Sequence, residues 1–341
     1  MLEQTMTPRP TLEEVAARAG VSRATVSRVV NGGSGVRQPL IDKVRKAVDE
    51  LGYVPNQAAR SLVTQRTGAV AVIIAEPEFR VFSDPFFERH VRGISRELSA
   101  NDLQLVLLWV EGESEHGRIA RYLSGGHVDG ALAFSLHSDD QLAHLIAHSR
   151  VPYVFGGRPP VGSASGAPYV DCDNRGGARA AVSHLVSAGR SKIAHIAGPS
   201  DQASAVDRAA GYHDVLIDGD PTLLQPGDFT EESGARAMAA LLYRCPGLDA
   251  VFAANDLMAR GAVRTLLERG LRIPEDVAVV GFDDMEDVAS GTVPALTTVR
   301  QDIEDMGRLM VRLLMRLLDH PERPGADSVI LPTALVQRQS S

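Results

Sequence analysis

A chain of 341 residues that is 44% hydrophobic and 23% charged has the composition of a globular protein with two or three domains. No apolar run reaches the roughly 18 residues of a membrane span, so no membrane segment is expected. Cys172 and Cys245 lie far apart and outside any Cys-x-x-Cys or Cys/His cluster, which argues against a disulfide framework and a zinc site. The first residues lack the apolar core of a secretory signal, and the cytoplasm is the expected compartment.

Charge is distributed unevenly along the chain. The net charge of −8, taken alone, argues against a nucleic-acid partner. Residues 1–66, however, hold 10 Lys and Arg against 6 Asp and Glu, whereas the remaining residues hold 25 against 37. A basic head on an acidic body is the pattern expected when only the head contacts phosphate.

A helix-turn-helix pattern follows a polar arm formed by residues 1–10. Apolar residues recur at helical spacing over 12–19, and Gly20 suits the positive φ of a C-terminal cap. Ser22 then suits the N-cap of a second helix, whose valines face inward. The outward face of that helix carries Arg, Thr and Ser, the side chains that a reader of the DNA major groove needs. The segment predicts DNA binding, with a plain helical hairpin as the alternative.

Two further segments complete the head. A third helix is expected over 38–51, with Pro39 in its first turn and Gly52 at its end. Residues 53–62 read as at most two turns of helix, too short to be stable alone in water. They form either an ordinary linker or a helix that requires a partner.

Strands and helices alternate from residue 67 onward. The run 68–75 is almost continuously apolar, as in a strand that is buried on both faces. Further strands are expected at 103–109, 130–134, 151–155, 192–197, 249–254 and 277–282. Helical patterns occupy 86–100, 115–123, 138–148, 176–188, 204–216, 231–243 and 255–269. This alternation predicts two α/β lobes with parallel sheets and a boundary near 162–166.

Short motifs along nearly the whole chain resemble those of the lactose-repressor (LacI/GalR) family of bacterial transcription regulators. The head carries Ala19-Gly20-Val21-Ser22 and Thr25-Val26-Ser27-Arg28-Val29, and the hinge carries Tyr53-x-Pro55-Asn56. The body carries Asp84-Pro85-Phe86-Phe87, Arg208-x-x-Gly211, Asn255-Asp256, Val280-Gly281-Phe282-Asp283-Asp284 and Leu296-Thr297-Thr298-Val299. Each motif is weak alone, but their order and spacing together are specific.

The resemblance implies an all-α helix-turn-helix head joined by a hinge helix to a two-lobed α/β body like a periplasmic sugar-binding protein. The expected division is an arm at 1–10, a DNA-binding domain at 11–52, a hinge helix and linker at 53–66, and an effector-binding and dimerisation domain at 67–341. Its first lobe is expected at about 67–170 and 300–322, and its second at about 171–299 and 323–341. Three strand crossovers would connect the lobes.

In the family, the second helix of the pair lies in the major groove. The resemblance assigns operator preference to Arg23, Ala24 and Arg28, and either arginine is expected to read guanine. Leu62 corresponds to the leucine that the family wedges into the minor groove at the operator centre. The predicted DNA-binding residues are Thr11, Ser22, Arg23, Ala24, Thr25, Ser27, Arg28, Asn31, Arg37, Asn56, Ala59, Arg60 and Leu62.

The resemblance also places a small polar effector, expected to be a sugar or sugar derivative, in a cleft between the lobes. Arg208 and Asp283 match effector-binding positions, and such a pair suits vicinal hydroxyls; the alternative is a structural ion pair. Phe229 stands where the family often places an aromatic ring against the ligand. The predicted effector-binding residues are Ser83, Phe86, Arg158, Asp171, Ser204, Arg208, Phe229, Asn255 and Asp283.

The sequence departs from the family pattern at three places. Arg37 stands where the third helix often begins with a phosphate-contacting hydroxyl, and it is expected to make that contact instead. The chain between Val215 and Phe229 is several residues shorter than usual, which puts the placement of Phe229 and Arg208 in question. No leucine-heptad tail follows Arg338, so a homodimer is expected rather than a tetramer.

The predicted function is therefore that of a transcriptional repressor, associated with the nucleoid, that binds double-stranded operator DNA as a homodimer. A purine-type corepressor system and an effector-independent DNA-bending protein stay open as alternatives. An enzyme is not expected, because the sequence has no nucleophile elbow, P-loop, Gly-x-Gly-x-x-Gly or metal-spaced cluster. No cofactor, metal or membrane partner is expected.

Overall fold

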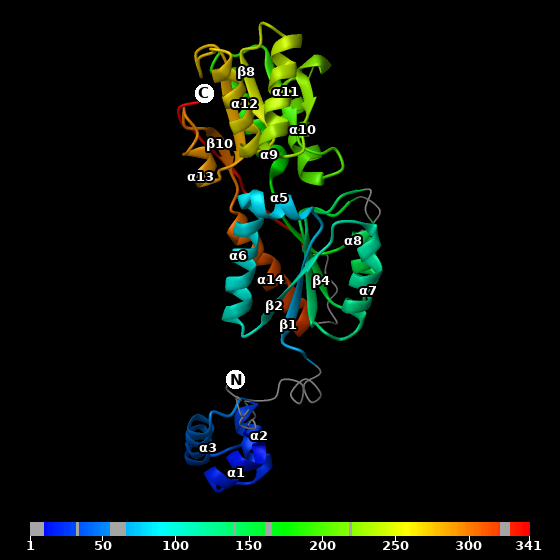
Figure 1. Ribbon diagram of the computed structural model, residues 1–341, viewed down its shortest axis with the longest axis vertical. Helices are drawn as coiled ribbons and strands as arrows, with labels where there is room; N and C mark the ends of the chain where they lie inside the picture. The colour runs from blue at the N-terminus through cyan, green and yellow to red at the C-terminus, as the bar shows by residue number, and fades with distance from the viewer. Residues whose placement is uncertain are drawn as a thin grey trace, which may run out of the picture. The chain divides into compact units, whose positions relative to one another are not determined.

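The computed structural model describes residues 10–31, 34–54, 66–138, 141–160, 166–217, 220–320 and 328–341. The chain divides into two compact units, Met1–Thr67 and Gly68–Ser341 (Figure 1). The boundary at residue 67 is the point where the sequence pattern changes. None of the helices in the described ranges is long and apolar enough to cross a membrane.

The described residues of the first unit form α1 (Leu12–Ala19), α2 (Arg23–Val30) and α3 (Gln38–Leu51), as the sequence predicted. The three helices pack around a small core of buried side chains. It consists of Val15, Ala16, Val26, Val44, Ala47 and Tyr53. The predicted hinge positions Asn56, Ala59, Arg60 and Leu62 lie outside the described residues.

Local capping fixes the turn between α1 and α2. Thr11 and Glu14 form a reciprocal capping box at the start of α1, so two of the free N–H groups of the helix are satisfied. Gly20 ends α1 with a φ of 66°, a conformation that costs glycine little. The Ser22 hydroxyl then accepts a hydrogen bond from the Thr25 N–H at 3.2 Å and starts α2.

The described part of the second unit contains two six-stranded sheets. The first has the order β11-β5-β4-β3-β1-β2 and is parallel throughout. Its strands are β1 (Ala69–Ile74), β2 (Gln104–Trp109), β3 (Gly130–Phe134), β4 (Tyr153–Gly156), β5 (Tyr169–Cys172) and β11 (Ser328–Leu331). The register aligns Val70 with Leu105 and with Gly130.

The second sheet has the order β12-β10-β9-β8-β6-β7, with only β12 antiparallel to its neighbour among the described strands. Its strands are β6 (Ile193–Ala197), β7 (Leu224–Pro226), β8 (Ala250–Ala253), β9 (Ala278–Asp283), β10 (Thr297–Arg300) and β12 (Ala334–Val336). Since βαβ connections cover both faces, the central strands of each sheet are almost fully buried.

Helices cover both sheets. Around the first sheet lie α5 (Glu78–Ser83), α6 (Pro85–Ala100), the 3₁₀ turn Glu113–Glu115, α7 (His116–Ser124), α8 (Leu142–Ala147) and α14 (Ile303–Asp319). The pair α6 and α14 packs on one side of this sheet, with α7 and α8 on the other (Figure 1). The second sheet is covered by α9 (Asn174–Ser187), α10 (Ala203–Val215), α11 (Glu231–Arg244) and α12 (Asp256–Glu268), with α13 (Glu286–Ala289) and the 3₁₀ turn Pro221–Leu223 nearby.

The chain crosses between the sheets three times, as expected, but the last crossing falls later than predicted. The sequence places residues 323–341 in the second lobe, whereas β11 (Ser328–Leu331) pairs in parallel with β5 in the first sheet. Only β12, from Ala334 onward, belongs to the second sheet. The prediction was wrong here because a four-residue edge strand with one buried side chain carries no sign of which sheet it joins.

Candidate effector and DNA sites

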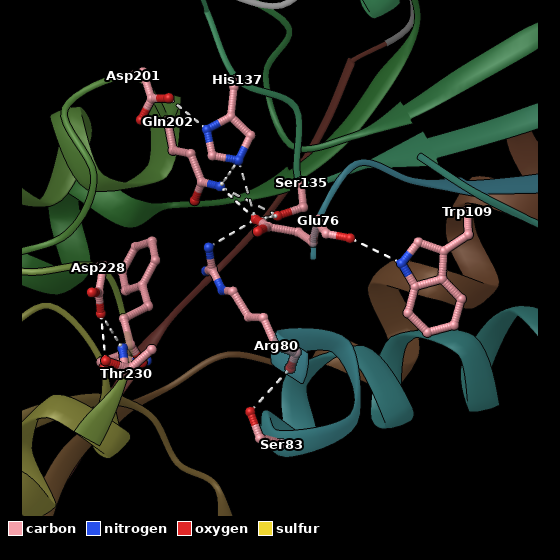
Figure 2. Close-up of polar contacts among 12 residues, drawn as sticks. Glu76, Arg80, Ser83, Trp109, Ser135, His137, Asp201, Gln202, Asp228 and Thr230 are labelled. Carbon is pink, nitrogen blue, oxygen red and sulfur yellow. Dashed lines mark hydrogen bonds and ion pairs between the residues drawn. The ribbon is translucent and has the colours of Figure 1, made fainter. Parts of the chain in front are cut away.

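The two lobes enclose a cavity of about 90 Å³ at the carboxyl ends of their parallel strands. This is where ligands bind in open parallel sheets. Eight of the nine predicted effector-binding residues line the cavity: Phe86, Arg158, Asp171, Ser204, Arg208, Phe229, Asn255 and Asp283. Ser83 is not among the lining residues, and its hydroxyl donates to the Arg80 carbonyl oxygen at 3.4 Å (Figure 2). The contact of each residue with an effector stays a prediction.

Arg208 is held rigidly in the cavity wall. It is 5% exposed, and its guanidinium donates to the Asn174 side chain at 2.9 Å and to the Ala254 carbonyl at 2.5 Å. The guanidinium carbon lies 3.8 Å from the centre of the Phe282 ring. A planar cation stacked on an aromatic face loses little further freedom when it binds a ligand.

Asp283 is the last residue of β9. Its carboxylate oxygen Oδ1 lies 3.4 Å from Nη1 of the Arg208 guanidinium. Its φ of 110° is strained for a residue with a Cβ, and such strain gathers at functional sites. Burial raises the pKa of Asp283 to about 7 although the charge of Arg208 acts in the opposite direction. A ligand hydroxyl that donates to this carboxylate would favour its charged form.

Phe229 lines the cavity despite the shortened segment that precedes it. It adopts a φ of 67°, and its ring lies so close to Gly198 that a Cβ there would come within 2.4 Å of it. The Asn255 amide donates to the Phe229 carbonyl at 2.9 Å, while its oxygen accepts from the Met258 N–H and caps α12. Asn255 therefore positions Phe229, a role that the sequence did not suggest.

Arg158 and Asp171 are both tied to their neighbours. The Arg158 side chain bridges the lobes to Asp207 on α10 at 2.6 Å, and its backbone N–H donates to Asp171 at 3.0 Å. Asp171 also accepts from the Asn174 amide at 2.9 Å. Burial raises the pKa of the Asp171 carboxyl, and these contacts hold it at the cavity edge.

A polar cluster at the mouth of the cavity was not predicted from the sequence. Glu76, the second residue after the end of β1, is 3% exposed and accepts hydrogen bonds from Arg80 at 2.8 Å, Ser135 at 2.6 Å and Gln202 at 2.9 Å (Figure 2). His137 lies 3.3 Å from Glu76 and 2.5 Å from Asp201. The cluster connects the lobes, because Asp201 and Gln202 precede α10 and the others belong to the first lobe. A carboxylate just beyond a buried strand was the available signal.

The charge state of His137 predicts a pH-dependent stability. Burial lowers the pKa of His137, but hydrogen bonds with Glu76 and Asp201 outweigh it and raise the pKa to about 9. The stabilisation should be complete below the unfolded pKa of about 6.5 and lost as the pH rises to about 9. The melting temperature of His137→Gln should therefore lie below that of the parent protein at pH 6, with the difference disappearing by about pH 9.5. The control is His127→Gln, because His127 is exposed. A difference in melting temperature between His137→Gln and the parent protein that does not change with pH would contradict the prediction.

The head presents its predicted DNA-contacting residues on the surface. Arg23, Ala24 and Arg28 are exposed on α2, whereas Thr25 and Ser27 are half-buried. The Arg23 guanidinium pairs with Glu13 at 2.9 Å. Thr11 and Ser22 serve as N-caps, and the Asn31 amide donates to Ser27 at 3.3 Å. Arg37 is the exposed N-cap residue of α3, but its side chain caps nothing.

Within the described ranges, no group of three or more His, Cys, Asp or Glu side chains is placed to hold a metal ion. The cavity instead combines fixed hydrogen-bonding groups with aromatic rings, which suits a polar, ring-shaped molecule.

Comparisons with known proteins agree with both units. Residues 11–56 match the family described as bacterial regulatory proteins, lacI family, and residues 182–341 match a periplasmic binding protein-like domain. The regulator CelR of Thermobifida fusca is 47% identical over 97% of this chain and 98% of its own length. The lactose operon repressor of Escherichia coli (strain K12) is 32% identical over 97% of this chain and 90% of its own.

Solved structures give the same result. A CelR–cellobiose complex is 45% identical, covers 98% of this chain and all of its own, and has a TM-score of 0.77. A Lac repressor dimer bound to operator and an anti-inducer is 31% identical over 98% of this chain and 99% of its own, with a TM-score of 0.83. This chain therefore belongs to the lacI family of bacterial regulators and is a DNA-binding transcriptional regulator rather than an enzyme.

Proposed function

We propose that this regulator represses transcription as an operator-bound homodimer and that its operator affinity is controlled by a β-linked glucose disaccharide such as cellobiose. The observation that carries the proposal is the buried Arg208–Asp283 pair beside Phe229 in the cavity between the lobes. The 45% identical relative solved with cellobiose supports the choice of sugar.

The wall of the cavity has the chemistry that a sugar requires. Arg208 supplies a fork of N–H donors to one hydroxyl, and Asp283 accepts from the adjacent one. Phe86 and Phe229 offer apolar ring faces to the C–H side of a pyranose. The cavity residues come from both lobes, so a bound sugar stabilises one arrangement of the lobes over another. The factor by which the sugar changes operator affinity equals the ratio of the sugar's affinities for the DNA-bound and the DNA-free protein.

The DNA-binding role is proposed for residues 11–52, with 53–66 as hinge helix and linker and the remainder as the effector-binding and dimerisation domain. The compact three-helix core and the division at residue 67 support this assignment. In each half-site α2 would enter the major groove with Arg23, Ala24 and Arg28 toward the bases. Leu62 from each subunit would wedge into the minor groove at the operator centre. The protein would act on nucleoid DNA in the cytoplasm.

A titration of labelled operator tests the proposal. The operator is first selected from randomised duplexes with the full-length protein, and fluorescence anisotropy then measures its Kd with and without ligand. Cellobiose should change the operator Kd at least tenfold, about 1.4 kcal/mol of coupling, whereas sucrose should not. If guanine changes the operator Kd but cellobiose does not, the purine-type alternative is favoured. No change with any ligand would favour an effector-independent protein.

A further inference from the structure

A second pocket of about 540 Å³ is lined by Glu76, Arg80, His137 and Asp201 of the polar cluster. Arg80 lines both spaces, while His137 and Asp201 line only the second. Both lobes contribute to the wall, because Asp201, Asp228 and Thr230 belong to the second lobe and Arg80 and His137 to the first.

The second pocket combines an aromatic ring with hydrogen-bond acceptors. Phe79 on α5 lines this pocket, and its side chain is 67% exposed. Exposure of an apolar ring to water is unfavourable compared with its burial. The carboxylates of Glu111, Glu113 and Asp228 lie around the same space. An apolar ring face beside several carboxylate acceptors suits a pyranose, whose C–H face is apolar and whose rim carries hydroxyl donors.

Arg80 supplies an independent sign that a ligand passes between the two spaces. The residue is 9% exposed, and its guanidinium donates one N–H group to Glu76 at 2.8 Å. Its Nε–H is buried and has no hydrogen-bond partner among the residues that the structure describes, a condition that few buried donors in folded proteins show. The guanidinium carbon lies 5.3 Å from the centre of the Phe229 ring in the cavity wall. An oxygen of a ligand that extends from the cavity would satisfy this donor.

We propose that the second pocket is a further sugar subsite, which takes the glucose units that extend beyond the cavity, so that the preferred effector is an oligosaccharide of three or more units. The inference rests on the proposed function, since the cavity must hold one end of the same oligosaccharide. The oligosaccharide would pass Arg80 and lay its outer unit against Phe79. Because both lobes form the second pocket, the added unit would also hold the lobes together.

Calorimetry with the full-length protein and a series of glucose, cellobiose and cellotriose tests this inference. In the parent protein, cellotriose should bind at least tenfold more tightly than cellobiose. In Phe79→Ala the ratio of the two Kd values should fall to about one. Phe82→Ala is the matched control, because Phe82 lies on the same helix, is 74% exposed and does not line the pocket. The ratio should stay unchanged in that variant.

The outcomes separate this inference from the proposed function. If cellobiose binds but cellotriose binds no more tightly, the second pocket is not a sugar subsite. The same conclusion follows if Phe79→Ala keeps the parent ratio, or if Phe82→Ala lowers it equally. If none of the three sugars binds, the proposed function fails as well. Glu113→Gln provides a second variant without an aromatic change, and it should lower the ratio at least twofold.

Discussion

Arg208→Ala should abolish the response of operator binding to the effector by raising the effector Kd about 100-fold or more. Two hydrogen bonds from a charged donor are worth on the order of 1.5–3 kcal/mol each, and the buried site lets little water replace them. Unliganded operator binding should persist, because the substitution lies in the second unit, Gly68–Ser341, and the head in the first. The measurement is a pair of titrations, calorimetry with the sugar and anisotropy with the operator.

Loss of structure is the competing explanation for such a result, because Arg208 also makes buried hydrogen bonds to Asn174 and Ala254 and removing it raises the pKa of the Asp283 carboxyl further. In the double variant Arg208→Ala with Asp283→Asn no buried acid can ionise, so its thermal stability should not fall at high pH, and it should not bind the sugar. Arg175→Ala is the matched control, since it breaks an exposed ion pair with Asp214, which lies on α10 as Arg208 does. Sugar binding within threefold of the parent value in Arg208→Ala would contradict a ligand role and favour a structural ion pair.

The sequence predicted the three described helices of the head, because each of their features is local. Helical periodicity, the Ser22 cap and the positive φ of Gly20 depend on neighbours within four residues. The long buried strands of the body were equally readable as apolar runs. The strands β5, β7, β10, β11 and β12 were missed because each has three or four residues, and pairing partners rather than pattern make them strands.

The cavity was predictable only in part, since its residues come from strand ends far apart in the sequence. Arg208, Asp283 and Phe229 were found through the family resemblance. Glu76 and Gln202 were missed although they share a hydrogen bond, because they are 126 positions apart and neither lies in one of the family motifs. The helix-cap function of Asn255 agrees with its place at the start of the helix expected over 255–269, whereas its donation to the Phe229 carbonyl depends on a side-chain direction that no sequence pattern encodes.

Arg23→Ala and Arg28→Ala should each change which operator the protein selects, and one of them should remove a preference for guanine. A bidentate arginine–guanine pair provides about 1–3 kcal/mol of discrimination. A homodimer makes that pair in both half-sites, so the effect on a symmetric operator doubles to about 2–6 kcal/mol, or roughly 30-fold to more than 10⁴-fold in Kd. Selection from randomised duplexes identifies the position that relaxes, and anisotropy on the parent operator measures the weakening.

The ion pair between Arg23 and Glu13 predicts a further effect on operator binding. Arg23 must exchange this ion pair before it reads a base, so Glu13→Gln should strengthen binding wherever Arg23 reaches DNA. Arg18→Ala is the matched control for the Arg23→Ala and Arg28→Ala variants. Arg18 also forms an ion pair, with Glu50, but it lies on α1 and not on the recognition helix α2. If either arginine instead binds a phosphate, its substitution would weaken binding to all sequences equally and reduce the salt dependence of log Kd. If both arginine variants keep the parent half-site preference, base reading by α2 must come from other side chains.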